Sequence, residues 1–485
     1  MDSKRICRSI AGGLLWITCG ATGCGPDLDR GLTTREEAVA AKETRAVVSA
    51  LVLIDQPTGR IPPSFLGISQ EWWLGPLSNS QLIGMFKRMS SFGTGPLILR
   101  VGGSTADIYN EVPAQSVWEV FAKLYREVGM KFIFDLNLGA NDPNLTLRQK
   151  QAALQFVPRE SILFFEIGNE PNYFAGKKMR PDNYLSYYPT EFKDFATAIG
   201  CNDVPCAGPA WGHIFCPAKT LDWFLKTNKD LVTLSTVHFY KANNETPNTA
   251  ETLLEEVAVR KAMDSLKKQV DVSTKLGIPL RVDESNPISG GGLEGVSNVF
   301  AAALWILDTL FETANAGAVG IDFHQGSPWY SFYESRDTAS PEGIYAQPAY
   351  YAILMFQEAV ARSADQATVL LKKQLQGPEL LKVWPIQQGN ELRVLVINKD
   401  EGVRAEVKLT LGGGCYGDGT LTRLLAPSLS AKSGITLAGI SYDSVAAKPS
   451  GTYQSEKVPA EKSGQNTVYS ISVPAASAAM VVMKK

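Results

Sequence analysis

From residue 64 onward, the chain alternates short apolar runs with longer amphipathic stretches. Apolar residues recur at helical spacing, for example at Val117, Phe121, Leu124 and Val128, and Gly129 follows where a left-handed residue would end that helix. Continuous apolar runs between such helices are typical of parallel strands that are buried on both faces. The predicted strands are 64–69, 96–101, 131–137, 162–167, 204–209, 232–240, 279–283 and 319–324.

Eight predicted strands in strict alternation with eight predicted helices indicate parallel strands joined by right-handed crossovers. Eight such units over about 290 residues are typical of a closed (β/α)8 barrel, the TIM barrel of the α/β class. A doubly wound open sheet is the alternative. That fold would need a Gly-rich phosphate loop after its first strand, and residues 67–71 do not form one.

The pattern changes after about residue 365, where helical spacing disappears and short alternating runs are separated by Gly and Pro. This change predicts a C-terminal antiparallel β-sandwich. An apolar run at 47–54 precedes the barrel and is expected to pair into the sandwich. The expected divisions are a signal peptide at 1–24, a flexible tether at 25–45, a strand at 46–58, the catalytic barrel at 59–362 and the sandwich at 363–485.

The N-terminus has the pattern of an export signal, with three basic residues before a short apolar stretch. Residues 21–24 resemble a bacterial lipobox, which would attach a lipid to Cys24, and plain cleavage near the same place is the alternative. We therefore expect an exported protein that is periplasmic, at the cell surface or secreted. In an oxidising compartment, Cys201 and Cys206 could form a disulfide across a short loop.

The charge balance narrows the classes of partner. A net charge of −2 argues against nucleic-acid binding and gives no electrostatic reason for membrane attachment. The chain has three histidines and no CxxC pair, so the sequence predicts no metal site and no cofactor. No protein partner is predicted.

Two of the predicted strands each end in a glutamate. The fourth predicted strand ends at Asn169 and Glu170, and the seventh ends at Glu284. These strands lie nearly opposite each other in an eight-stranded barrel, whose catalytic groups stand at the C-terminal strand ends. A lone Asn-Glu pair after an apolar run is more often a helix cap or a surface turn. Two glutamates on facing strands are what the cleavage of a glycosidic bond requires.

The chemistry assigns roles to these residues. Glu170 would be the acid/base and must hold a proton near neutral pH, whereas Glu284 would be the nucleophile and must stay ionised. Arg100 and Tyr240 are placed to hold the Glu284 carboxylate, and Asn169 is placed to bond the sugar 2-hydroxyl. A separation of about 5 Å between the carboxyl groups would give retention of configuration, and a wider gap would give inversion.

Other residues near the strand ends are less clear from the sequence. His238 is interpreted as a core histidine and left out of the site, whereas His324 is included in it. Trp72, Trp73 and Trp329 could stack on sugars or fill the mouth of the barrel.

Several segments resemble glycoside hydrolase family 79, which belongs to clan A of the retaining glycosidases and holds β-glucuronidases and heparanases. They are Gly-Asn-Glu-Pro-Asn at 168–172, Asp-Glu-Ser at 283–285, Leu-Arg-Val-Gly-Gly-Ser-Thr at 99–105, Phe-Leu-Gly-Ile-Ser at 65–69 and the glycines at 290–292.

The resemblance implies a uronic acid as the substrate sugar. Its carboxylate would bind the backbone amides of Gly290 and Gly291, and successive glycine amides can form such an anion-binding nest. Tyr330 would contact the carboxylate, and Ser104 and Glu71 would contact the sugar hydroxyls. Glu71 stands where the family pattern has Asp, and Ser289 stands where relatives often carry Tyr.

These features predict a retaining exo-β-glucuronidase that removes terminal β-linked glucuronic acid from glycans or glycoconjugates. An endo-β-glucuronidase that acts on heparan-type polysaccharides is one alternative, although no dense basic cluster borders the predicted strands. A non-catalytic carbohydrate-binding lipoprotein is the alternative from another class, and it would have no need of both glutamates.

Overall fold

The structure is a computed structural model that describes residues 44–485, apart from 73–74, 94, 202, 336–342 and 361–367. The predicted signal peptide, lipid attachment at Cys24 and most of the predicted tether lie outside the described residues. None of the helices in the described part of the chain is long and apolar enough to cross a membrane.

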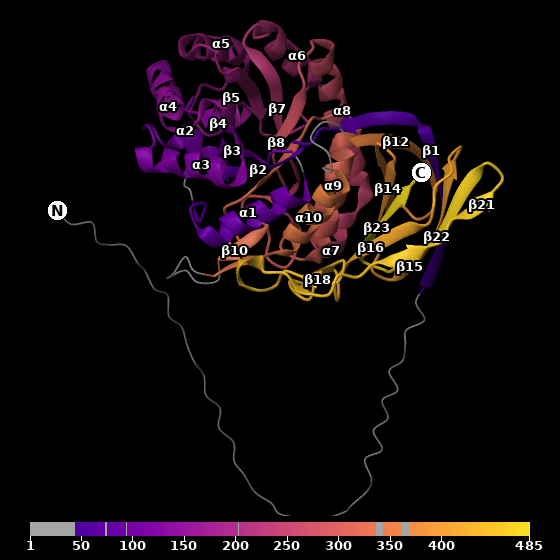
Figure 1. The fold of residues 1–485 in the computed structure, drawn as a ribbon. Helices are drawn as coiled ribbons and strands as arrows, with labels where there is room; N and C mark the ends of the chain where they lie inside the picture. The colour runs from indigo at the N-terminus through magenta and orange to yellow at the C-terminus, as the bar shows by residue number, and fades with distance from the viewer. Residues whose placement is uncertain (1–43, 73–74, 94, 202, 336–342, 361–367) are drawn as a thin grey trace, which may run out of the picture. The chain divides into compact units, whose positions relative to one another are not determined.

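Eight strands close into a barrel, as the sequence predicts (Figure 1). Every strand runs parallel to its neighbours, and the last strand pairs with the first. The prediction of a (β/α)8 barrel is therefore confirmed. The strands are β2 (Leu66–Glu71), β3 (Ile98–Gly102), β4 (Lys131–Leu136), β5 (Ile162–Ile167), β6 (Cys206–Trp211), β7 (Val232–Asn243), β8 (Leu280–Ser289) and β9 (Ile321–His324).

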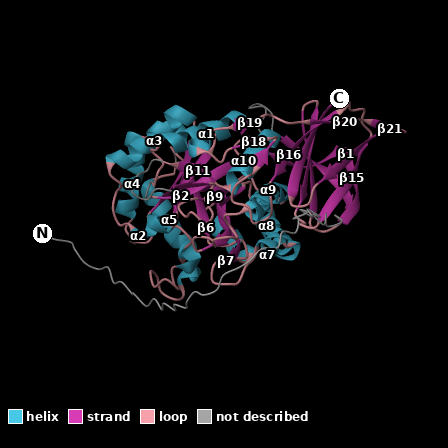
Figure 2. Cartoon of the chain, turned by 90° about the horizontal axis from the view of Figure 1, so that it is seen from below, coloured by secondary structure: helices cyan, strands magenta, loops and turns pink. Residues whose placement is uncertain are grey.

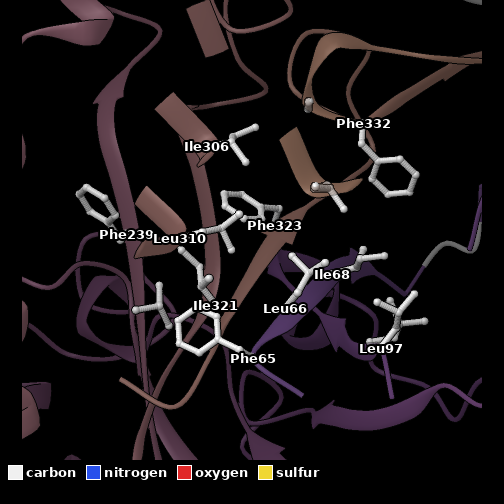
Figure 3. Packing of buried hydrophobic residues seen from close by; sticks show 14 of the residues in the cluster. Phe65, Leu66, Ile68, Leu97, Phe239, Ile306, Leu310, Ile321, Phe323 and Phe332 are labelled. Carbon is white, nitrogen blue, oxygen red and sulfur yellow. The ribbon is translucent and has the colours of Figure 1, made fainter. Parts of the chain in front are cut away.

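Helices surround these strands (Figure 2). Phe239 of β7, Ile321 of β9 and Leu310 of α9 belong to one buried cluster, so the barrel wall and its helices share a core (Figure 3). The α-helices are α1 (Ser80–Phe92), α2 (Ser104–Ile108), α3 (Gln115–Val128), α4 (Pro143–Phe156), α5 (Tyr188–Ile199), α6 (Ala218–Thr227), α7 (Ala250–Leu254), α8 (Glu256–Lys275), α9 (Phe300–Asn315) and α10 (Pro348–Val360). The 3-10 helices are η1 (Arg159–Ser161), η2 (Pro171–Tyr173), η3 (Tyr184–Ser186) and η4 (Val445–Ala447), and β10 (Tyr333–Ser335) forms a hairpin with β11 (Ile344–Ala346).

The C-terminal region forms a separate 13-stranded sheet with its own buried cluster, which includes Val48, Val383 and Ile471. Its strands are β1 (Thr44–Ile61), β12 (Thr368–Gln376), β13 (Leu381–Gln388), β14 (Glu391–Asn398), β15 (Val403–Gly412), β16 (Gly419–Leu425), β17 (Thr436–Leu437), β18 (Ile440–Ser441), β19 (Ser450–Gly451), β20 (Glu456–Val458), β21 (Glu461–Ser463), β22 (Asn466–Val473) and β23 (Ser477–Lys484).

Strand β1 differs from the prediction in two ways. It runs from Thr44 to Ile61, so residues 59–61, assigned to the barrel from the sequence, belong to the sheet, as do the last two residues of the predicted tether. It pairs antiparallel with β12 but parallel with β15, so the sheet is not purely antiparallel. A parallel partner is available because β1 comes from the opposite end of the chain and needs no short hairpin to reach β15.

Helix α9 lies between the barrel and the sheet, and apolar residues cover its whole circumference because both sides are buried. Its one buried carboxylate, Asp308, accepts a hydrogen bond from Trp384 at 2.8 Å and pairs with Lys399 at 2.6 Å. Glu256 of α8 pairs with Lys382 at 2.8 Å. These ion pairs fix the sheet against the outer face of the barrel.

Candidate active site

The backbone after β5 places Glu170 at the barrel mouth. Gly168 and Glu170 both have positive φ, +81° and +55°, and the Glu170 amide donates to the Ala210 carbonyl at 3.1 Å. A left-handed conformation costs a residue with a Cβ roughly 1–2 kcal/mol. The chain therefore accepts local strain at Glu170, as is common where a side chain must be aimed at a substrate.

A bulge in β8 brings two consecutive acids to the same side. Neighbouring residues of a regular strand point to opposite faces, but the pairing of β8 with β9 shifts between Val282 and Ser285. As a result, both Asp283 and Glu284 reach Arg100 inside the barrel, at 3.7 Å and 2.8 Å. The bulge delivers Glu284 to the mouth while Asp283 stays in the core.

Arg100 of β3 organises the floor of the site. Its guanidinium is fully buried and donates to Glu166 at 2.9 Å, to Glu284 at 2.8 Å and to the Asn169 side-chain oxygen at 2.9 Å. It also donates to Asp135 at 3.2 Å. Arg100 and Tyr240 were both predicted to hold the nucleophile, and the Tyr240 hydroxyl donates to the other Glu284 oxygen at 2.7 Å.

The two predicted catalytic glutamates converge. One carboxylate oxygen of Glu170 and one of Glu284 lie within 4.8 Å of each other and of a ring nitrogen of His238. Pairs of carboxyl groups about 5–5.5 Å apart are typical of retaining glycosidases, whereas inverting enzymes need about 6.5–9.5 Å to admit a water molecule. The geometry fits a reaction in which one carboxylate attacks the anomeric carbon while the other carboxyl group protonates the departing oxygen.

The exclusion of His238 from the site is wrong. Its Nδ1 lies 3.2 Å from Glu170 and 3.9 Å from Glu284, and its Nε2 lies 3.8 Å from Asp283. The side chain is fully buried, as a core histidine would be, but it is buried between the two acids. The register shift between Val237 and His238 helps to turn the ring inward, and the sequence carries no sign of that shift.

The surroundings of Glu284 keep it ionised. Burial alone would raise the pKa of this carboxyl group, but the nearby imidazoles of His324 and His238, the charge of Arg100 and the hydrogen bond from Tyr240 lower the pKa well below its usual range. His324 lies 3.7 Å from both Glu284 and Glu71. These two carboxylates outweigh the effect of burial and raise the pKa of His324, so the imidazole favours its charged form.

Asn169 is 2% exposed, held from both sides, and is not among the residues that line the cavity. Its side-chain oxygen accepts from Arg100, and its backbone amide donates to Asp107 at 2.7 Å. Burial raises the pKa of Asp107 to about 6, although the hydrogen bonds from the amides of Asn169, Leu138 and Gly139 lower it. With its oxygen engaged, Asn169 can offer only its NH2 group to a ligand.

A cavity of about 530 Å³ opens above the glutamates. Glu71 reaches it from the end of β2 and is fixed by the backbone amide of Thr105 at 2.9 Å. His324 at the end of β9 outweighs burial and lowers the pKa of Glu71. The predicted site residues that line the cavity are Glu71, Ser104, Glu170, Tyr240, Glu284, Gly290, Gly291, His324 and Tyr330.

The glycine loop closes one side of this cavity. Gly290 and Gly291 have φ of +70° and +92°, and their carbonyl oxygens accept hydrogen bonds from Asn244 and Ser327. The positive φ of Gly290 favours glycine there, and a Cβ at this position would push aside the end of the Asn244 side chain, 2.5 Å away. Tyr330 lies next to the loop, 6.1 Å from the His324 ring.

Five cavity residues, Tyr173, Gly212, His213, Ala242 and Asn243, were not foreseen. Of the two alternatives for the tryptophans, the structure favours packing at Trp72, which packs on Trp118 at 5.1 Å and donates to the Asp135 carbonyl. Trp73 lies outside the described residues. Trp329 is 41% exposed and does not line the cavity.

Two groups of side chains in the described residues have the spacing of metal ligands. Glu170, His238 and Glu284 form one, but both Glu284 oxygens already accept hydrogen bonds from Arg100 and Tyr240. The second group consists of Glu256, Asp308 and Glu312, which are neutralised by Lys382 and Lys399 at the barrel–sheet contact.

Fold and site together define the architecture of a glycoside hydrolase: a TIM barrel with two facing glutamates and an attached β-domain. The family model described as the glycosyl hydrolase family 79 C-terminal beta domain matches residues 383–480. A beta-glucuronidase of Aspergillus niger is 26% identical over 48% of this chain and 49% of its own length. The chain thus spans about half the length of this curated relative.

Solved structures share the fold over most of the chain. A 4-O-alpha-L-rhamnosyl-beta-D-glucuronidase from Fusarium oxysporum 12S has a TM-score of 0.72 at 16% identity and covers 89% of this chain and 99% of its own. A GH51 arabinofuranosidase from Xanthomonas axonopodis pv. citri has a TM-score of 0.66 at 15% identity, and the match covers 91% of this chain and 100% of that structure's chain. The family model and the curated relative show that the chain is similar to glycoside hydrolase family 79, and the solved structures show that it shares the fold of other glycoside hydrolases.

Proposed function

We propose that the protein is a retaining exo-β-glucuronidase that hydrolyses terminal β-linked glucuronic acid from glycans or glycoconjugates. The observation that carries the proposal is the approach of Glu170 and Glu284 to within 4.8 Å at the floor of a cavity. The name of the Aspergillus niger relative supports the same sugar specificity.

The reaction takes two displacements. A Glu284 oxygen attacks the anomeric carbon while Glu170 gives its proton to the departing oxygen, so the bond to the aglycone breaks as the bond to Glu284 forms. Glu170, now a carboxylate, takes a proton from water, and the water oxygen displaces Glu284 from the same carbon. The sugar leaves with its original configuration. The NH2 group of Asn169 donates to the 2-hydroxyl.

The glycine loop supports a uronic acid as the sugar. A sugar carboxylate near Gly290 and Gly291 can accept hydrogen bonds from their backbone amides, because no side chain stands in the way. Tyr330 and the charged form of His324 add hydrogen-bond donors on the same side. None of the described residues that line the cavity is Lys or Arg. A heparan-type polymer would reward a basic cleft, so the lining favours exo action on less charged substrates.

The test compares hydrolysis of phenyl β-glucuronide and phenyl β-glucoside by the wild type and by Glu284→Ala. The proposal expects kcat/KM for the glucuronide to exceed that for the glucoside by about 100-fold or more. Each hydrogen bond to the charged carboxylate of the sugar is worth about 1.5–3 kcal/mol, and the site offers several donors for such bonds. Equal rates on both sugars would overturn the uronic acid assignment. Rapid shortening of a heparan polymer would overturn exo action.

We also propose that the protein is exported to the periplasm, the cell surface or the medium. The Cys201–Cys206 disulfide supports this, because such bonds persist in oxidising compartments. Fractionation of cells that express the full chain tests it, and recovery of the protein solely in the cytoplasm would contradict it.

A further inference from the structure

The cavity divides into two halves, each governed by one catalytic glutamate. Around Glu284, a ring nitrogen of His324 lies 3.7 Å from the carboxylate, and the Tyr330 ring lies 6.1 Å from the His324 ring. Around Glu170, a Cβ on Gly212 would lie close to both the Glu170 carboxylate and the Tyr173 ring, and the His213 ring lies 5.9 Å from that of Tyr173. In the proposed reaction, the aglycone departs past the acid, so the half around Glu170 must receive the leaving group.

That half is built from aromatic rings. The Tyr173 ring lies 5.9 Å from the ring of His213, and the His213 ring lies 6.4 Å from that of Phe215, with interplanar angles of 46° and 37°. Tyr173 and His213 line the cavity, and Phe215 continues the row outward with 55% of its surface exposed. A large exposed aromatic side chain beside a catalytic cavity is available to cover a flat ligand.

The row is uncharged and held in place. Burial outweighs the attraction of Glu170 and lowers the pKa of His213, and burial raises the pKa of Tyr173 to about 12, so both rings are neutral at neutral pH. The ammonium of Lys177 lies 5.9 Å from the centre of the Tyr173 ring and 3.6 Å from Glu170, which ties the ring to the acid.

Gly212 makes this arrangement possible. A Cβ on Gly212 would lie 2.2 Å from the Tyr173 ring and 2.9 Å from a Glu170 oxygen, so any other residue would displace one of the two. Its amide donates to the Asn172 side chain at 2.8 Å, which joins the end of β6 to the segment that carries Tyr173. Both sides of this junction are therefore shaped to keep an aromatic ring beside the acid.

We propose that Tyr173, His213 and Phe215 form a leaving-group subsite that stacks a flat ring next to the scissile bond. The ring is either the apolar face of a hexopyranose or an aromatic aglycone, because both present the same flat apolar surface. This inference rests on the proposed function, since it assigns the partner of the sugar that the glutamates release.

The experiment compares kcat/KM for three glucuronides: methyl β-glucuronide, which has no ring in its aglycone, phenyl β-glucuronide, and a disaccharide of glucuronic acid β-linked to glucose. The readout is kcat/KM for each substrate with a ring in its aglycone, divided by kcat/KM for the methyl compound. Differences in leaving-group reactivity affect this ratio equally in every variant, so they cancel when variants are compared. Tyr173→Leu should lower the ratio about fivefold to tenfold, whereas Tyr173→Phe keeps it, because stacking needs the ring and not the hydroxyl. Phe215→Ala, at an exposed position that does not endanger folding, should lower the ratio by a smaller factor.

Tyr453→Leu is the matched control, because Tyr453 is 58% exposed but lies on the C-terminal sheet domain. A fall in the phenyl ratio alone assigns the subsite to aromatic aglycones, and a fall in the disaccharide ratio alone assigns it to sugars. Unchanged ratios in both Tyr173→Leu and Phe215→Ala would overturn the subsite while the proposed function survives. Failure of the wild type to cleave any of the three glucuronides would overturn the proposed function and the subsite with it.

Discussion

A carboxylate oxygen of Glu170 lies within 4.8 Å of one of Glu284, although 284 − 170 = 114 residues separate them in the chain. Glu170 follows the end of β5 and Glu284 lies within β8, and closure of the barrel brings these positions to one mouth. His238 of β7 lies between them. The proposed chemistry depends on this convergence, and each of its parts makes a separate prediction.

Replacing the acid should matter most for poor leaving groups. We expect Glu170→Gln to lower kcat/KM on methyl β-glucuronide by about 10²–10⁴-fold, because the departing alkoxide needs a proton. With 2,4-dinitrophenyl β-glucuronide, whose leaving group is stable as an anion, the loss in kcat/KM should be at least tenfold smaller. Equal losses on both substrates would show that Glu170 is not the acid.

His238 should act by positioning Glu170. The substitution His238→Phe keeps the ring volume but removes the hydrogen-bonding nitrogen 3.2 Å from Glu170, and it should lower kcat/KM by about twofold to tenfold, the value of an ordinary hydrogen bond to the protonated acid. Because the acid step suffers, the loss should be larger on methyl than on 2,4-dinitrophenyl β-glucuronide. Losses of the same size on the two substrates would indicate a purely structural role.

The charge of His324 should set the acidic limb of the pH profile. The nucleophile works as a carboxylate, so activity falls as the pH drops through the pKa of Glu284, which the structure holds well below its usual range. His324→Gln removes the nearest positive charge other than Arg100, so the pKa of Glu284 should rise and the acidic limb of kcat/KM should move to higher pH. A limb that stays in place or moves to lower pH would contradict this assignment.

Arg100 should be needed for stability as well as for catalysis. Arg100→Met leaves Asp135, Glu166, Asp283 and Glu284 buried without their common cation. Removing one side of a buried ion pair typically costs about 3–5 kcal/mol of the unfolding free energy. Urea denaturation measures the change, with Arg148→Met, an exposed arginine that pairs at 3.7 Å, as the control expected to cost less than about 1 kcal/mol. Equal effects of the two substitutions would contradict the assigned role.

The sequence predicts the barrel well because each strand carries its own local signal. An apolar run that ends at Gly168 places β5 at its observed residues, Ile162–Ile167, and the ends of the predicted strands then indicate Glu170 and Glu284. Arg100 and Tyr240 follow because residues at strand ends of a barrel share one rim.

The remaining site residues depend on features with no local signal. His238 turns inward where the β7–β8 pairing shifts register, and a shift of one residue reverses which face a side chain occupies. Tyr173 and His213 meet only because η2 and the end of β6 fold against each other, with Gly212 leaving the space. Trp72 is of a residue type that often stacks on sugars. Its burial beside Trp118 is decided by the packing of α3, which the local sequence does not reveal.

Covalent trapping of the nucleophile tests the central claim most directly. A 2-deoxy-2-fluoro-β-glucuronosyl fluoride slows both displacements, because fluorine removes the 2-hydroxyl contact and destabilises the transition state, while the activated leaving group still allows the first step. Peptide mass spectrometry of the inactivated wild type should find the sugar on Glu284, and Glu284→Gln should stay unlabelled. A label on any other residue, or an uninhibited enzyme that releases the inverted sugar, would contradict the account.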